Sequence, residues 1–158
     1  MVQPNIGIST QNLKKITASL GEVLADAVML YTKTRKFHWN VSGESFMEFH
    51  KLFEKQYKQL EESIDEIAER INKLGSPTPG TTAEFVKLSQ IKEAPGKIFS
   101  SIDMVKELLN DHENVIKSIR KKIDECDDDL KDKGTADFLT SLMENEETIA
   151  WTLRRYLS

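Results

Sequence analysis

The chain has few of the features that mark secreted, membrane-spanning or nucleic-acid-binding proteins. Its 158 residues include one cysteine, Cys126, so an internal disulfide bond is excluded. That usage fits a reducing compartment, and we expect a cytoplasmic protein. No apolar run approaches the roughly 20 residues that cross a membrane. The N-terminus, MVQPNIGISTQNLKK, lacks the basic start, apolar stretch and cleavage site of a secretory signal.

The chain also has no excess of positive charge. The formal net charge is −4, whereas a dedicated nucleic-acid-binding domain is usually basic. Residues 1–15 carry Lys14 and Lys15 and no acid, a small bias that is more typical of a solvated tail than of a DNA-binding arm. DNA binding is therefore an alternative and not the leading expectation.

Helical periodicity dominates what the sequence does contain. Apolar residues recur at steps of three and four, as in the helices of a bundle, and no strand-like alternation competes. The glycine- and proline-rich segment GSPTPGTT, residues 75–82, interrupts the pattern, and AEFVKLSQI after it predicts a short helix. Four long helices are predicted, from about Ser9 to Val41, from the break at 42–45 to about Leu74, from Pro95 to about Ile123, and from a cap at Thr135 onward after a polar turn at 124–134.

These segments predict one all-α domain over residues 1–158, with residues 1–8 as a short tail. The fold is a four-helix bundle with a short extra helix in the long connection between its second and third helices. Ferritin-like bundles use a crossover of this kind.

Histidines and carboxylates form the most informative pattern. His38 and His50 flank the break Ser42-Gly43-Glu44-Ser45, and Glu54 follows His50 by four residues. Asp65 and Glu69 form a second pair at the same spacing, which places each pair on one helix face. Imidazole with carboxylates suits iron, zinc or manganese better than calcium. The alternative is a solvated acidic face paired with neighbouring lysines, Lys51, Lys55 and Lys58.

Distance along the helix limits how the two pairs can work together. His50 and Glu69 would lie about 28 Å apart on one helix, so they cannot hold the same ion within one chain. The Glu-x-x-His pairs of intrachain di-iron bundles are also missing. Two copies of the second helix that cross antiparallel near Leu60 would bring the early pair of each to the late pair of the other. The break would fold His38 back beside His50.

The motifs resemble those of the Dps family, the mini-ferritins named as DNA-binding proteins from starved cells. The similar residues are FHWNVSG, F-x-x-F-H at 46–50, FE at 53–54, DEIAER at 65–70, TADFL at 135–139 and the terminal AWTLRRYL. The resemblance implies a homododecameric shell around a hollow cavity, with ferroxidase sites at the two-fold interfaces. It assigns as ligands His38, His50 and Glu54 of one subunit with Asp65 and Glu69 of its mate. The family more often has Asp where this chain has Glu54.

The same resemblance implies an iron-storage and detoxification function. The family oxidises Fe2+, preferably with hydrogen peroxide rather than dioxygen, and stores Fe3+ as a mineral, which protects against oxidative damage. Trp39, next to His38, could intercept stray oxidising equivalents or simply pack at the dimer interface.

Iron in this family enters through acidic channels at the three-fold axes, near the start of the last helix. Asp137 lies there in this chain, with Asp132 and Asp128 nearby, although such residues can also form a solvated turn. Not every member of the family binds DNA. His112 and Cys126 lie outside the family's site pattern, so we expect His112 in the core or on the surface and assign Cys126 no catalytic role.

Overall fold

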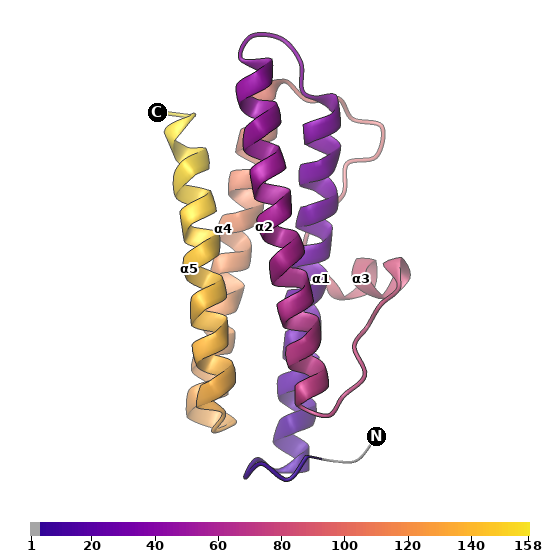
Figure 1. Ribbon diagram of the computed structural model, residues 1–158, viewed down its shortest axis with the longest axis vertical. Coiled ribbons are helices and arrows are strands. Elements are labelled where there is room, and N and C mark those ends of the chain that lie inside the picture. The colour runs from indigo at the N-terminus through magenta and orange to yellow at the C-terminus, as the bar shows by residue number, and fades with distance from the viewer. Residues whose placement is uncertain (1–3) are drawn as a thin grey trace.

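The structure is a computed structural model that describes residues 4–158, and it is built from helices (Figure 1). The bundle helices are α1 (Thr10–Asn40), α2 (Phe46–Lys73), α4 (Ser101–Asp124) and α5 (Lys133–Arg155). The short α3 (Thr82–Leu88) lies in the connection between α2 and α4, and a π-helical turn, η1 (Glu125–Asp129), joins α4 to α5. The predicted all-α four-helix bundle with an extra helix is confirmed. The predicted tail, residues 1–8, is described from residue 4.

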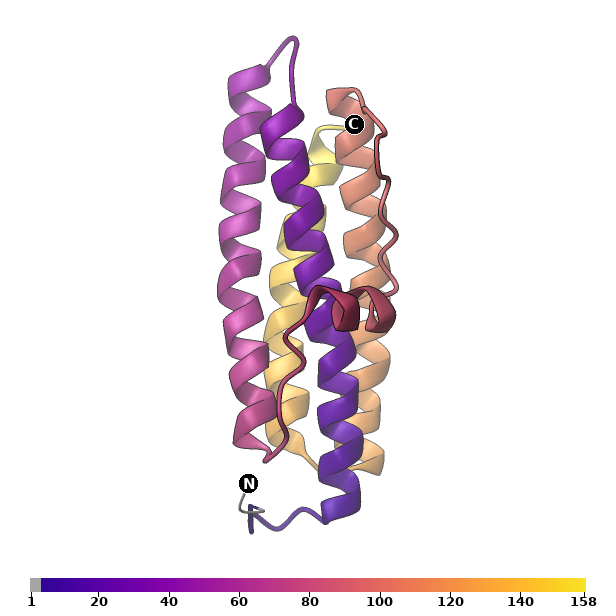
Figure 2. The ribbon, with the colours of Figure 1, turned by 90° about the vertical axis from the view of Figure 1, so that its right-hand side faces the viewer.

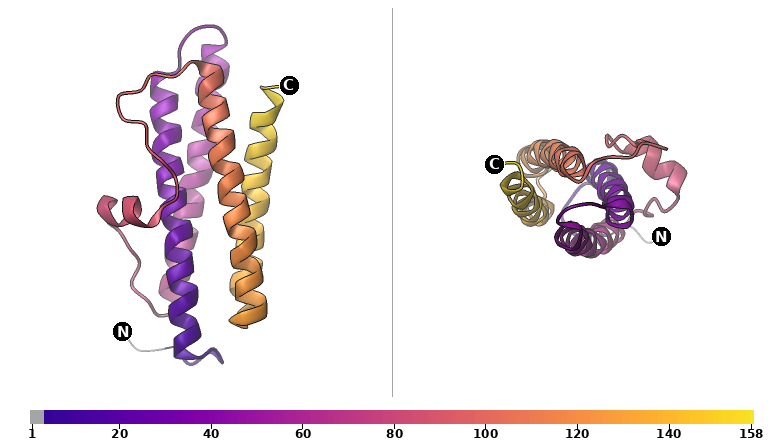
Figure 3. Two further views of the ribbon diagram at one scale, coloured as in Figure 1. Left: turned by 180° about the vertical axis from the view of Figure 1, so that it is seen from behind. Right: turned by 90° about the horizontal axis from the view of Figure 1, so that it is seen from above.

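The four long helices form two antiparallel hairpins packed side by side (Figures 1 and 2). Viewed from above, α1 and α2 form one pair and α4 and α5 the other, while α3 lies outside the bundle beside α1 (Figure 3). The C-terminus lies at the same end as the α1–α2 connection. None of the helices within residues 4–158 is long and apolar enough to cross a membrane.

The third long helix begins later than the prediction from Pro95. Residues 91–100 have no helical structure, and Pro95 and Gly96 form a turn in which Gly96 has a φ of 71°. The helix starts at Ser101, after Ser100 Oγ accepts a hydrogen bond from the Asp103 backbone N–H at 3.2 Å. A serine cap thus starts the helix, although Pro95 is also a residue type that often occupies a first turn.

The cap of the last helix was also predicted at the wrong residue. Asp132, not Thr135, is the N-cap of α5, and its Oδ1 accepts the Thr135 backbone N–H at 3.0 Å. Arg70 of α2 reaches the same carboxylate with a nitrogen–oxygen distance of 3.4 Å. Asp132 is consequently only 5% exposed.

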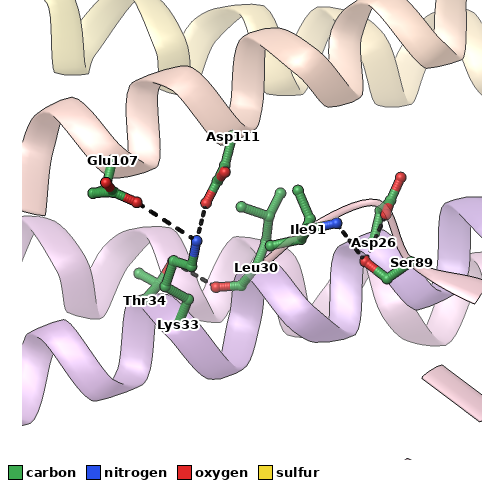
Figure 4. A network of polar contacts seen from close by, with 8 residues as sticks. All are labelled: Asp26, Leu30, Lys33, Thr34, Ser89, Ile91, Glu107 and Asp111. Atoms are coloured by element: carbon green, nitrogen blue, oxygen red, sulfur yellow. Dashed lines mark hydrogen bonds and ion pairs between the residues drawn. The ribbon is translucent and has the colours of Figure 1, made fainter. Parts of the chain in front are cut away.

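Two contacts fix the long connection and the hairpins to each other (Figure 4). Asp26 of α1 is buried and accepts hydrogen bonds from Ser89 Oγ at 2.7 Å and from the Gln90 backbone N–H at 2.9 Å. Lys33, also on α1, forms an ion pair with Asp111 of α4. The first contact holds the segment after α3 against α1, and the second joins the two hairpins.

The hydrophobic core consists of two clusters that follow one another along the bundle. The cluster at the end near the α1–α2 connection is made by Phe37, Val41, Phe49, Phe53, Met104, Val105, Leu108, Ile149 and Leu153. The larger cluster fills the rest of the bundle. Its residues closest to the smaller cluster are Leu30, Leu60, Val115 and Met143. The helices keep a common register because both clusters draw on all four of them.

Candidate metal centre

His38 and His50 meet at the end of the first hairpin, as the break in the sequence predicted. Their rings stack with centroids 3.7 Å apart and planes 21° from parallel. Each ring also bonds to the backbone of the other residue. The Nδ1 of His38 lies 2.8 Å from the carbonyl oxygen of His50, and the Nδ1 of His50 lies 2.9 Å from that of His38.

This exchange of hydrogen bonds decides which ring nitrogens are free. A carbonyl oxygen can only accept, so both Nδ1 atoms must carry hydrogen. In the neutral rings the lone pair is therefore on Nε2 of each histidine. A backbone carbonyl that accepts from one ring nitrogen is the usual support of a metal-binding histidine, because it fixes the tautomer and the orientation of the ring.

Glu54 lies one turn after His50 and is half-buried. Lys58 Nζ donates to its Oε1 at 2.6 Å, and this bond is the main reason that the pKa of the Glu54 carboxyl is lowered. His38 and His50 contribute smaller effects in the same direction. Glu54 thus stays an anion beside two imidazoles, which is a combination that suits a transition-metal cation.

Asp65 and Glu69 lie farther along α2, and both are exposed. Glu69 Oε2 accepts a hydrogen bond from Lys73 Nζ at 2.9 Å. Lysine partners of this exposed kind contribute little and can be displaced by a cation. The residues of both pairs lie on one side of α2, with the pair at Asp65 the more exposed.

The two halves do not meet within one chain. Among residues 4–158, no group of three or more His, Cys, Asp or Glu side chains is gathered so that it could hold a metal ion. Leu60, midway between the halves, is 1% exposed and packs in the core of its own chain. A crossing helix near this level would therefore contact its outward neighbours, such as Glu61, and not Leu60 itself.

Three contacts of aromatic rings at the site were missed by the sequence reasoning. The Tyr57 ring meets the His38 ring edge-on at 5.3 Å. Arg35 lies over Tyr57 at 4.8 Å, and its carbon Cζ is 5.2 Å from the ring of Trp39. The sequence spacing could have indicated Tyr57, because this residue follows Glu54 by three positions and so lies next to it on the same helix face. Trp39 itself is 65% exposed.

The three candidate channel residues differ in their surroundings. Asp137 and Asp128 are exposed near the junction of η1 and α5. Asp132 is instead the buried cap of α5, where its oxygens face Thr135 and Arg70. We carry Asp137 and Asp128 forward as candidates, because their carboxylates face solvent.

Neither residue without an assigned role belongs to this centre. His112 is fully buried, which selects the core from the two places that the sequence left open. Burial raises the pKa of the Cys126 thiol to about 11, and the nearby Asp132 and Glu125 charges add to the effect. The acidic neighbours are thus a secondary cause of the raised pKa, and the thiol is a poor nucleophile.

Comparison with known proteins places the fold and the motifs in one family. Residues 17–158 match the ferritin-like domain family. A DNA protection during starvation protein of Bacillus anthracis is 34% identical, and the alignment covers 92% of this chain and 98% of that protein. The chain belongs to the Dps family.

Two solved Dps structures agree with this chain in fold and length, and a further relative agrees in sequence over most of its length. The crystal structure of a Dps protein from Bacillus brevis superposes with a TM-score of 0.90 at 31% identity, covering 96% of this chain and 100% of that one. A Vibrio cholerae Dps protein, described as a member of the ferritin-like diiron-carboxylate superfamily, has a TM-score of 0.92 at 28% identity and covers 100% and 98%. A low temperature-induced protein of Nostoc is 41% identical, over 99% of this chain and 88% of that protein.

Proposed function

We propose that this Dps-family protein oxidises Fe2+ and stores Fe3+ as a mineral in a hollow dodecameric shell. The Vibrio cholerae relative is described as a diiron-carboxylate protein, which supports iron as the metal. In this proposal Fe2+ is the substrate, and hydrogen peroxide or dioxygen is the oxidant. The protein would bind Fe2+ at a site where the iron can be oxidised without release of hydroxyl radicals.

The observation that carries the proposal is the pair of reciprocal bonds between His38 and His50. Fixing both Nδ1 atoms as donors leaves both Nε2 atoms as ligand atoms. Glu54 adds an anion whose pKa is lowered, mainly by Lys58. This half-site holds imidazole and carboxylate donors in the mixture that suits Fe2+ and leaves room for further ligands.

The partner subunit would complete the site with its own acidic pair. Asp65 and Glu69 lie about 17 Å and 22 Å along α2 from Glu54, far beyond the reach of one ion. A two-fold axis places the same surface of each chain against the other, so the Asp65–Glu69 half of one copy can face the His38–His50 half of the other. Two equivalent sites then form at each such interface.

Pairing of irons makes peroxide a safe oxidant. Each Fe2+ loses one electron, and peroxide takes up two electrons and two protons as its O–O bond breaks to give water. A lone Fe2+ would supply one electron and release a hydroxyl radical. Trp39, exposed and adjacent to His38, is our candidate to intercept such equivalents, with interface packing as its alternative role.

Iron would enter through the acidic surface at the start of α5. Asp137 and Asp128 are exposed there, and carboxylates that line a narrow channel concentrate cations. The protein would act in the cytoplasm, as a protection against iron and peroxide together. The formal net charge of −4 disfavours contact with DNA phosphates, so DNA condensation is not part of this proposal.

Mixed shells test the shared site. One variant, His38→Ala/His50→Ala, lacks the imidazoles, and the other, Asp65→Ala/Glu69→Ala, lacks the acids. Each alone should lose peroxide-dependent Fe2+ oxidation, followed by absorbance after anaerobic loading. In shells assembled from equal amounts of both, about half of the interfaces pair unlike subunits, and each restores one of its two sites.

We therefore expect about a quarter of the wild-type activity to return. Mixed shells as inactive as either parent would show that the ligands are not shared. A wild-type protein without peroxide-dependent oxidation would instead refute the proposed function as a whole. Sedimentation of each shell provides the control for assembly.

A further inference from the structure

A band of buried polar side chains separates the two hydrophobic clusters of the bundle. Each long helix contributes one polar residue to this band. On each helix, that residue lies between the part that belongs to one cluster and the part that belongs to the other. We call the set the mid-bundle polar layer, which consists of Thr34 on α1, Gln56 on α2, His112 on α4 and Glu146 on α5. All four are at most 8% exposed.

Cross-helix contacts show that these residues share one level. His38 and His50 lie opposite each other, and Gln56 is six residues along α2, or about 9 Å. On the antiparallel α1, Lys33 lies five residues before His38, or about 7.5 Å along the axis. Lys33 forms an ion pair with Asp111 of α4. His112 follows Asp111 and bonds Glu146. Gln56, His112 and Glu146 thus lie at about the same level of the bundle, to within the length of the Lys33 side chain.

The polar atoms of this layer are only partly satisfied by protein. His112 Nδ1 is bonded to Glu146, but His112 Nε2 is fully buried and has no partner among residues 4–158. Both Nε2 and Oε1 of Gln56 are likewise buried and without partners. Thr34 does not help, because its hydroxyl donates to the Leu30 carbonyl oxygen at 2.8 Å. Buried polar groups almost always have a partner, from protein or from ordered water.

The charges of the layer decide what kind of partner fits. An ionised Glu146 only accepts, so His112 Nδ1 is the N–H and Nε2 of the neutral ring holds a lone pair. A divalent cation on that lone pair would leave an uncompensated positive charge in the core, since Glu146 already bonds His112 and the neighbouring Asp111 is already paired with Lys33. Burying such a charge is far more costly than burying a neutral group. A protonated ring would present N–H instead and could bind no cation at all.

We propose that the mid-bundle polar layer is a binding site for internal water that bridges His112 Nε2 and the amide of Gln56. Water can donate to the lone pair or accept from an N–H, so it satisfies His112 in either protonation state. It can also accept from Gln56 Nε2 or donate to Oε1, and two to four polar partners are what a buried water requires.

This water links α2 to α4 across the bundle. The other polar bridges between the hairpins run elsewhere, such as Lys33 to Asp111 between α1 and α4 and Arg70 to Asp132 between α2 and the start of α5. α2 carries His50 and Glu54. The bridging water would therefore help to fix the position of α2 along the bundle axis, and with it the positions of these two residues. The inference is independent of the proposed function, since it depends only on the core.

A crystal structure of the assembled wild-type protein at about 1.8 Å or better is the direct test. We expect a peak of solvent density within hydrogen-bonding distance of His112 Nε2 and the Gln56 amide. After a cobalt soak, this position should show no anomalous signal. An empty layer, a direct bond between the two side chains, or a cobalt peak on Nε2 would each overturn the proposal.

Substitution of Gln56 gives a second test whose sign separates a hydrated layer from a dry one. Gln56→Met keeps the length of the side chain. If water bridges the two residues, the variant removes one of its partners, and the unfolding midpoint should fall by about 2–4 °C. In a dry layer the same change removes two unsatisfied groups, so a higher midpoint would overturn the proposal. Gln11→Met on the exposed start of α1 is the matched control.

Discussion

Removing the buried ammonium group of Lys33 should weaken the fold strongly. Its side chain is 9% exposed and that of its partner Asp111 10%, and a second carboxylate, on Glu107, lies 4.0 Å from the same nitrogen (Figure 4). Lys33→Met keeps most of the apolar stem but leaves Asp111 buried without a counter-charge. Breaking a buried pair in this way costs about 3–5 kcal/mol, so the unfolding midpoint should fall by about 6–20 °C.

The pH dependence of this loss follows from Asp111. Burial raises the pKa of its carboxyl, and the bond from Lys33 opposes that rise. Because the pKa is higher in the folded protein than in the unfolded chain, the folded state binds the proton more tightly, and stability falls as pH rises through that window. Without Lys33 the pKa rises further. The stability difference between variant and wild type should therefore be largest at neutral pH and shrink as the pH falls and Asp111 becomes protonated.

Calorimetry of the assembled protein at fixed concentration measures both effects. The double variant Lys33→Met/Asp111→Leu should recover most of the loss, because it removes the orphaned charge. Lys106→Met is the matched control, since its pair with Asp103 is exposed and should change the midpoint little. A Lys33→Met protein as stable as wild type, or a difference that grows toward acid pH, would refute the reasoning.

Two further predictions concern the start of α5 and the shell surface. Asp132→Ala should lower stability by about 1–2 kcal/mol through loss of the α5 cap; unchanged thermal unfolding together with slower iron uptake would instead favour a channel role for Asp132. Long duplex DNA should migrate unretarded with the wild-type protein in a gel-shift assay at physiological salt, because net negative subunits repel phosphates, and a clear shift would contradict this.

The helices were predictable because their signals are local. Ser9 caps α1 through the Asn12 backbone N–H, and the long apolar stripes end where α1 and α2 end. Pro95 misled because it is followed by Gly96, whose left-handed φ of 71° turns the chain before Ser100 can cap α4. The cap of α5 was predicted at Thr135 and not at Asp132, because a carboxylate in an acidic turn looks solvated until Arg70 of another helix reaches it.

In the candidate site, too, the features set by local sequence were predictable and those set by contacts between distant segments were not. The positions of His38 and His50 on either side of the break predicted their meeting, because a short break must fold one helix end beside the other. The exchange of hydrogen bonds that selects Nε2 depends on backbone carbonyls, which no side-chain pattern contains. Gln56 reads as a surface residue in the sequence, and only the packing of four helices shows that it is buried.

The central claim is that one iron site is built from two subunits. Anomalous diffraction at the iron edge, from crystals of the wild-type protein loaded anaerobically with Fe2+, tests it directly. The account predicts peaks at the two-fold interface, within coordination distance of His38 and His50 of one subunit and of Asp65 and Glu69 of its mate. Peaks held by ligands of a single subunit, or none at these residues, would contradict it.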